Sequence, residues 1–151
     1  MKRTICLAGM GLLLVSMVMV SCAPMQKTVL TKSNVSALKG NWEGWTTFSS
    51  VQSAPVLTTM QIMNDTVPLA GNITLINLPD PVASIFPADA KTAGGNVTID
   101  FNNGGITDQG TLKGQRGENF LEMTYYGGEK PKLIGWFYYF FAKGTVEFKK
   151  K

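Results

Sequence analysis

The sequence contains no histidine and only two cysteines, Cys6 and Cys22. Histidine is the side chain that most often serves as a general base or a metal ligand, so its absence removes both of those options. A Ser–His–Asp triad cannot form within this chain. Because both cysteines lie in the first 22 residues, the rest of the chain has no thiol nucleophile, no cysteine metal site and no disulfide. These absences predict a protein that is not an enzyme and that holds no metal and no cofactor.

Carboxylates are the remaining groups that could carry chemistry. Asp100, Asp108, Glu118 and Glu122 could flank a glycosidic bond, but their spacing selects no pair. The stretch NNGGITDQG, residues 102–110, faintly resembles a calcium loop but lacks the ligand order and closing Glu of an EF-hand. We therefore expect solvated carboxylates and a turn, and we assign no catalytic residue.

Net charge is small, with 14 Lys and Arg against 10 Asp and Glu. No basic stripe runs through the chain, so a nucleic-acid partner is not expected. The basic excess gathers in Lys149–Lys150–Lys151. Such a triplet can contact anionic lipid head groups, although a solvated end is the simpler expectation.

The first 24 residues have the order of a secretory signal peptide. Positive charges at Lys2 and Arg3 precede an apolar run over residues 5–20, and small Ser21 follows. Pro24 would end a helix soon after this run. Ordinary secretion and an uncleaved membrane anchor stay open as alternatives, because a run of this length approaches what a bilayer requires.

The stretch Met19–Val20–Ser21–Cys22 resembles the lipobox of bacterial lipoproteins. It departs from that pattern at Met19, where Leu is commoner. The resemblance implies that the Cys22 thiol carries a diacylglyceryl group, with acyl chains such as palmitate, and that residues 1–21 are removed as a signal peptide. Ala23 stands where retention in the inner membrane typically requires Asp. The resemblance therefore implies an outer-membrane lipoprotein if the host has two membranes.

Beyond Cys22 the chain divides into a tether, residues 22–37, and one domain, residues 38–151. The tether is small and polar, whereas the domain alternates apolar and polar residues, as strands do. Eight segments carry this pattern: 38–49, 55–64, 67–78, 95–101, 105–114, 118–127, 132–142 and 144–150. Most breaks between them are short and rich in Gly, Asn and Pro, which favours antiparallel neighbours. The sequence thus predicts an all-β fold, a single antiparallel eight-stranded meander that closes into a barrel.

The start of the first segment supports this prediction. Gly40–Asn41–Trp42 resembles the G-x-W with which lipocalins open their first strand, and Leu38-x-Gly40-x-Trp42 resembles the start of avidin-like barrels. In lipocalins that Trp packs across the closed end of the barrel against a basic residue late in the chain. Gly40 and Trp42 match, but the basic partner stays unassigned between Arg116 and Lys149.

Two features do not fit a simple hairpin barrel. The connection over residues 79–94 is long and contains three prolines, yet it also carries apolar Val82, Ile85 and Phe86. It is either a lid over a cavity or a plug on one barrel end. Residues 135–142 are apolar on both faces, which predicts a covered strand, a dimer seam or an interface. The candidate ligand-binding residues are Val82, Ile85, Phe86, Tyr125, Trp136 and Tyr138.

The sequence leaves two functions open. The first is non-enzymatic binding of a small or apolar ligand in the cell envelope, because an eight-stranded barrel has room for about one such molecule. The alternative is a structural or protein-interaction module with a filled barrel. Small residues at Gly40, Gly44, Thr46 and Gly71 could leave the space that the first function needs.

The lipobox resemblance predicts the effect of one substitution. Cys22→Ala should block lipidation and leave an unprocessed precursor, because both steps act on this thiol. Intact mass spectrometry of the membrane fraction measures both effects. Normal maturation of the variant, without a lipid on the wild-type protein, would exclude a lipoprotein.

Overall fold

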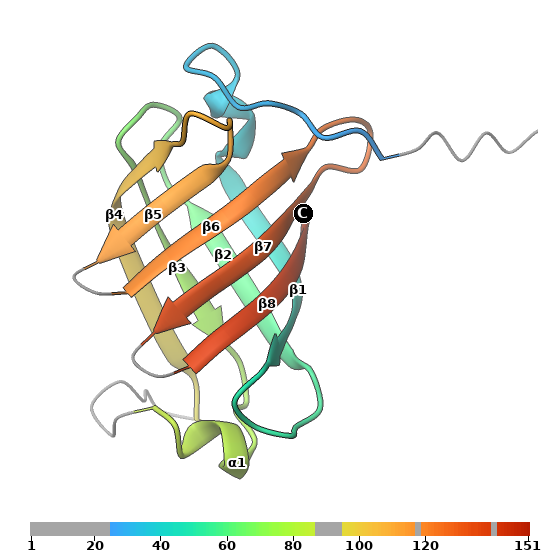
Figure 1. The fold of residues 1–151 in the computed structure, drawn as a ribbon, viewed down its shortest axis with the longest axis vertical. Helices are drawn as coiled ribbons and strands as arrows, with labels where there is room; N and C mark the ends of the chain where they lie inside the picture. Colours follow the sequence, from blue (N-terminus) through green and yellow to red (C-terminus); the bar gives the residue numbers. More distant parts are fainter. Residues whose placement is uncertain (1–24, 87–94, 117–118, 140–141) are drawn as a thin grey trace, which may run out of the picture.

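The computed structural model describes residues 25–86, 95–116, 119–139 and 142–151. Within these ranges eight antiparallel strands form a closed barrel in which each strand pairs with its neighbour along the chain, and β1 pairs with β8 (Figure 1). The strands are β1 (Gly40–Phe48), β2 (Val56–Ile62), β3 (Leu69–Leu75), β4 (Val97–Ile106), β5 (Leu112–Arg116), β6 (Asn119–Tyr126), β7 (Lys132–Tyr139) and β8 (Ala142–Lys150). The predicted all-β meander barrel is confirmed, and it is consistent with a lipocalin-like fold.

Alternation along each strand decides which side chains enter the barrel. In β8, Val146 and Phe148 are buried whereas Lys143 and Glu147 are exposed. The inward sets predicted for β4 and β6 are also buried: Val97, Ile99, Phe101, Leu121, Met123 and Tyr125. Apolar burial of about 25 cal/mol per Å² is the main force that holds such a sheet in register.

The prediction was wrong between β4 and β5, where a strand was expected over residues 105–114. Instead, β4 continues to Ile106, and the turn lies between Thr107 and Thr111. The expected turn at Asn102–Gly105 is strand because Gly104 pairs with Leu69 beside a bulge, where a Cβ atom would lie 2.8 Å from the Leu69 Cβ. The true turn has Gly110 at φ +69°, a conformation that favours glycine.

The segment expected to be a tether packs against the barrel from Lys27 onward. The Thr28 amide donates to the Tyr125 carbonyl at 2.9 Å, and the Leu30 amide donates to the Gly110 carbonyl at 3.0 Å. Leu30 and Val35 join the core. The expected signal peptide, residues 1–21, and Cys22 lie outside the described residues. No helix in the described ranges is long and apolar enough to cross a membrane.

A 3-10 helix, η1 (Val35–Leu38), leads into β1 and covers one end of the barrel (Figure 1). Trp42 lies beneath it, 1% exposed, and its indole Nε1 donates to the Leu38 carbonyl at 2.8 Å. The Lys150 Nζ lies 5.6 Å from the centroid of the Trp42 ring and donates to the Ala37 carbonyl at 2.6 Å. Lys150 thus takes the place of the late basic residue that the sequence left unassigned.

Two tryptophans of β1 provide a matched test of this core. Trp42→Ala should lower the free energy of unfolding by about 3–5 kcal/mol, because it leaves a cavity and an unpaired Leu38 carbonyl. Trp45, on the same strand, is 60% exposed, and Trp45→Ala should cost below about 1 kcal/mol. Urea denaturation of both variants measures the difference. Equal losses would contradict the inward position of Trp42.

Candidate functional site

The barrel interior is the site that the ligand-binding hypothesis needs. Gly71 was expected to leave space, but a Cβ atom there would lie 2.7 Å from the Phe101 Cζ. At Gly44 a Cβ atom would collide with the backbone carbonyl of Glu147 on β8. Neighbouring strand and ring atoms therefore occupy the volume beside both glycines, and glycine permits the close approach of backbones rather than forming a hollow.

Thr46 on β1 and Thr58 on β2 are two buried polar side chains that lie beside each other in the barrel wall. Their hydroxyl oxygens lie 2.7 Å apart, and the Thr58 hydroxyl also approaches the Val56 carbonyl at 3.0 Å. Both residues are fully buried. Buried polar groups that face a cavity often orient a ligand. These two satisfy each other, so an apolar or polar guest would have to compete with an existing hydrogen bond.

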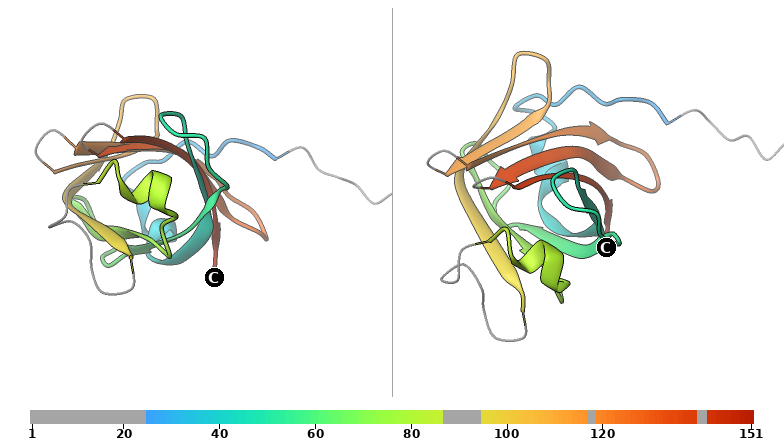
Figure 2. Two further views of the ribbon diagram at one scale, coloured as in Figure 1. Left: turned by 90° about the horizontal axis from the view of Figure 1, so that it is seen from below. Right: turned by 60° about the horizontal axis from the view of Figure 1, so that its bottom comes forward.

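The far end of the barrel is covered by the long connection after β3. A short helix, α1 (Asp80–Ala83), lies across this end when the barrel is viewed along its axis (Figure 2, left). Val82 is fully buried. Phe86 packs edge-to-face on Phe48 at 5.9 Å and stacks on Tyr139 at 5.7 Å between ring centroids. These contacts are those of an apolar plug, and they cover Tyr139 of the predicted aromatic strand.

The structure distributes the six candidate ligand-binding residues over three places. Val82, Ile85 and Phe86 lie together at the α1 end, where Ile85 is half-buried against the core. Tyr125 lies at the η1 end, 6.4 Å from Trp42 between ring centroids. Trp136 and Tyr138 alternate with buried Phe137 and face outward. The six residues therefore do not line one cavity.

The outward aromatic residues form their own surface feature. Phe120 on β6 packs edge-to-face on Trp136 at 4.8 Å and lies 5.5 Å from Tyr138, and we call these three residues the outer aromatic cluster. The Lys143 Nζ lies 5.1 Å from the centroid of the Trp136 ring. Phe120 remains 36% exposed. Sequence reasoning missed Phe120, although alternation with buried Leu121 already places it on the outer face.

A surface groove of about 400 Å³ begins at this cluster and carries polar side chains. Its polar lining consists of Thr107, Asp108, Gln109, Lys113 and Glu122. Of the four carboxylates considered from sequence, the structure brings Asp108 and Glu122 to this groove and leaves Asp100 exposed on β4. Glu118 lies outside the described residues. Glu122 Oε1 accepts a hydrogen bond from the Thr111 hydroxyl at 3.1 Å. The described ranges contain no group of three potential metal ligands.

A second surface groove, of about 540 Å³, follows the seam between β1 and β8. Glu43 and Glu147 line it together with Lys149, Lys150 and Lys151. Lys151 Nζ pairs with Glu43 Oε1 at 2.7 Å. Trp45 also lines this groove, and it borders a separate apolar groove that contains Pro55, Leu57 and Pro79. The hollows described here thus lie on the outside of the barrel.

Comparison of this chain with known protein families, with curated proteins and with solved structures finds no match.

The plug geometry predicts the cost of opening the α1 end. Phe86→Ala should lower the free energy of unfolding by about 3–5 kcal/mol, because it removes ring contacts with both Phe48 and Tyr139. Ser84 lies in the same turn, is exposed, and donates its hydroxyl to the Pro81 carbonyl. Ser84→Ala is therefore the matched control and should cost below about 1 kcal/mol. If the connection were instead a lid that opens freely, the two variants would lose equally little free energy of unfolding. Thermal and urea melts measure both losses.

Proposed function

We propose that this chain is a lipid-anchored protein of the cell envelope that works as a non-enzymatic interaction module. In this proposal the barrel is filled by its own side chains, and its outer surface binds a protein partner. The observation that carries this proposal is the occupancy of the interior. Phe101 fills the space beside Gly71, Trp42 closes one end and Phe86 closes the other. Binding sites for small molecules are usually preformed hollows of about 300–1,000 Å³.

The ligand-binding hypothesis, in which the barrel carries a small or apolar molecule, requires rearrangement of this interior. A guest would have to displace the Phe101 ring, separate Thr46 from Thr58 or withdraw Phe86 from between its two aromatic neighbours. Each change exposes apolar surface or leaves a buried hydroxyl unpaired, and both are costly. An interaction module needs none of these changes, so the resting geometry favours it.

The outer surface offers what such a module needs. Aromatic side chains are enriched in protein interfaces, because they supply large contact areas at a low entropy cost. The outer aromatic cluster and the 60%-exposed Trp45 provide two such surfaces. Grooves with polar lining lie beside both of them. A protein partner in the envelope is the occupant whose chemistry fits mixed aromatic and charged surfaces of this kind.

The proposed anchor is Cys22, and its support comes from the lipobox resemblance of Met19–Cys22. We place the protein on the outer membrane of a two-membrane host, because Ala23 follows the cysteine. The absence of histidine and of thiols after Cys22 supports a role without catalysis. No cofactor is part of the proposal.

Uptake of a fluorescent fatty acid distinguishes a barrel whose interior is filled from a barrel that carries a ligand. The mature protein should show no saturable increase in probe fluorescence, because the interior is occupied. Phe101→Ala should create an internal space beside Gly71 and gain measurable uptake, which proves that the assay detects an interior site. Saturable binding of one probe by the wild-type protein would refute the filled barrel and restore the carrier hypothesis.

A further inference from the structure

One end of the barrel gathers basic side chains, and it is the end at which the N-terminal segment joins the barrel. The C-terminal strand ends here, since the Lys151 amide donates to the Asn41 carbonyl at 2.9 Å. The β6–β7 turn is adjacent, because the Lys150 amide donates to the Pro131 carbonyl. The N-terminal segment crosses the same region through the pairing of Lys27 with Tyr126. We call this region the basic end.

Lysines outnumber carboxylates at the basic end. The lysines are Lys27, Lys32, Lys39, Lys130, Lys132, Lys149, Lys150 and Lys151, and the side-chain carboxylates are Glu43, Asp65, Asp108, Glu129 and Glu147. The side chains of this end therefore carry a net charge of about +3 at neutral pH. In the described loops around α1, by contrast, the charged side chains are Asp80 and, at the start of β8, Lys143.

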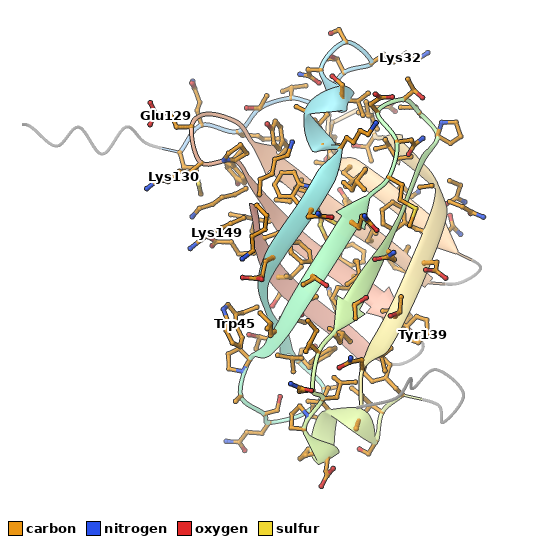
Figure 3. The ribbon with its side chains drawn as sticks, turned by 180° about the vertical axis from the view of Figure 1, so that it is seen from behind. Lys32, Trp45, Glu129, Lys130, Tyr139 and Lys149 are labelled. Atoms are coloured by element: carbon orange, nitrogen blue, oxygen red, sulfur yellow. The ribbon has the colours of Figure 1, made fainter. Side chains whose placement is uncertain are left out.

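Ion pairing divides these lysines into two groups. Lys39 pairs with Asp65, Lys132 with Glu147 and Lys151 with Glu43. The Lys150 ammonium donates to the Ala37 carbonyl and contacts the Trp42 ring. Within the described part of the chain, the other four lysines have no carboxylate within ion-pair distance, and all four are exposed: Lys27, Lys32, Lys130 and Lys149. Figure 3 shows Lys32, Lys130 and Lys149 toward the basic end, whereas Trp45 and Tyr139 lie toward the α1 end.

The short chain between the proposed anchor and the barrel limits how far the basic end can lie from the membrane. Cys22 and Lys27 are five residues apart, so even a fully extended chain spans at most about 18 Å between them. Electrostatic attraction to a charged surface acts over about 8 Å at physiological ionic strength. A connection of this length keeps Lys27 near the membrane surface, so the basic end can reach the lipid without any extension of the barrel.

We propose that the basic end docks on anionic lipid head groups of the membrane that holds the protein, and that this contact orients the barrel with α1 away from the lipid. The proposal rests on the lipid anchor proposed above. Exposed lysines without carboxylate partners supply the attraction, because each lysine near an anionic surface strengthens binding by about fivefold. The occupant is a lipid surface rather than an acidic protein, because the anchor brings the surface and the lysines together.

The experiment compares the mature lipidated protein in two kinds of nanodisc, one of neutral phosphatidylcholine and one that also contains phosphatidylglycerol. Hydrogen exchange is measured by mass spectrometry. In the anionic discs, amides of residues 127–130 and 149–151 should exchange several-fold more slowly than in the neutral discs. Amides of residues 49–54, near α1, should exchange equally in both. Molar salt should remove the difference, because it shortens the screening length to about 3 Å.

Two lysines on one face of β8 give a matched pair of variants. Lys149 lies at the basic end and Lys143 at the other end, and both side chains face outward. The two residues are about 20 Å apart along the strand. Lys149→Glu should reduce the difference between the two discs, and Lys149→Glu combined with Lys130→Glu should abolish it, whereas Lys143→Glu should preserve it. Equal exchange of the wild-type protein in both discs would overturn the proposal, and so would an equal effect of Lys143→Glu and Lys149→Glu.

Failure of the anchor can be told apart from failure of the docking surface. If mass spectrometry finds no lipid on Cys22, the anchor proposal is wrong, and the secreted protein is tested by flotation with vesicles of the same two compositions. Binding to the anionic vesicles alone, reduced about fivefold by Lys149→Ala, would retain the docking surface. Absence of flotation with the anionic vesicles would overturn it.

Discussion

Pairing of β1 with β8 is the interaction on which the rest of this structure depends. It converts a meander into a closed barrel, so no strand edge between them is left to pair with another chain. Glycines make the tight curvature possible, because Gly44 on β1 lies directly against the Glu147 carbonyl of β8 and Gly135 on β7 lies against the Glu122 carbonyl of β6. Closure at eight strands leaves an interior about as wide as the side chains that fill it.

The two ends of the barrel are closed in different ways. At the η1 end the closure is partly polar, since Trp42 and Lys150 each donate to a carbonyl of the chain that leads into β1. At the α1 end it is apolar, and Phe86 lies between Phe48 and Tyr139. The Lys150–Ala37 hydrogen bond of the polar closure links the beginning of the domain to its last strand. The apolar closure comes from a connection between neighbouring strands.

Period-two alternation predicted the strands and their inward faces, because every second residue of a strand faces the same side of the sheet and the buried side is apolar. The same alternation also predicts the position of the C-terminal lysines. Val146 and Phe148 face inward, so the same parity places Lys150 inward and Lys149 outward, which identifies the partner of Trp42. The β4–β5 turn was misplaced because Asn102–Gly105 has turn composition, whereas Gly104 is required by its approach to Leu69 on another strand. Composition within a segment cannot reveal such a contact between strands.

The same limit applies to the outer surface of the barrel, where the aromatic cluster lies. Sequence can show that Trp136 and Tyr138 are aromatic, but only the register of β6 with β7 places Phe120 beside them. Lys143 and Tyr138 are paired across β7 and β8, so the outer aromatic cluster lies toward the α1 end of the barrel. In the orientation proposed above, with the basic end on the lipid, this cluster would face away from the membrane. Under the proposed function, the packed interior would supply rigidity, the basic end would orient the barrel, and the exposed aromatic surface would face protein partners in the envelope.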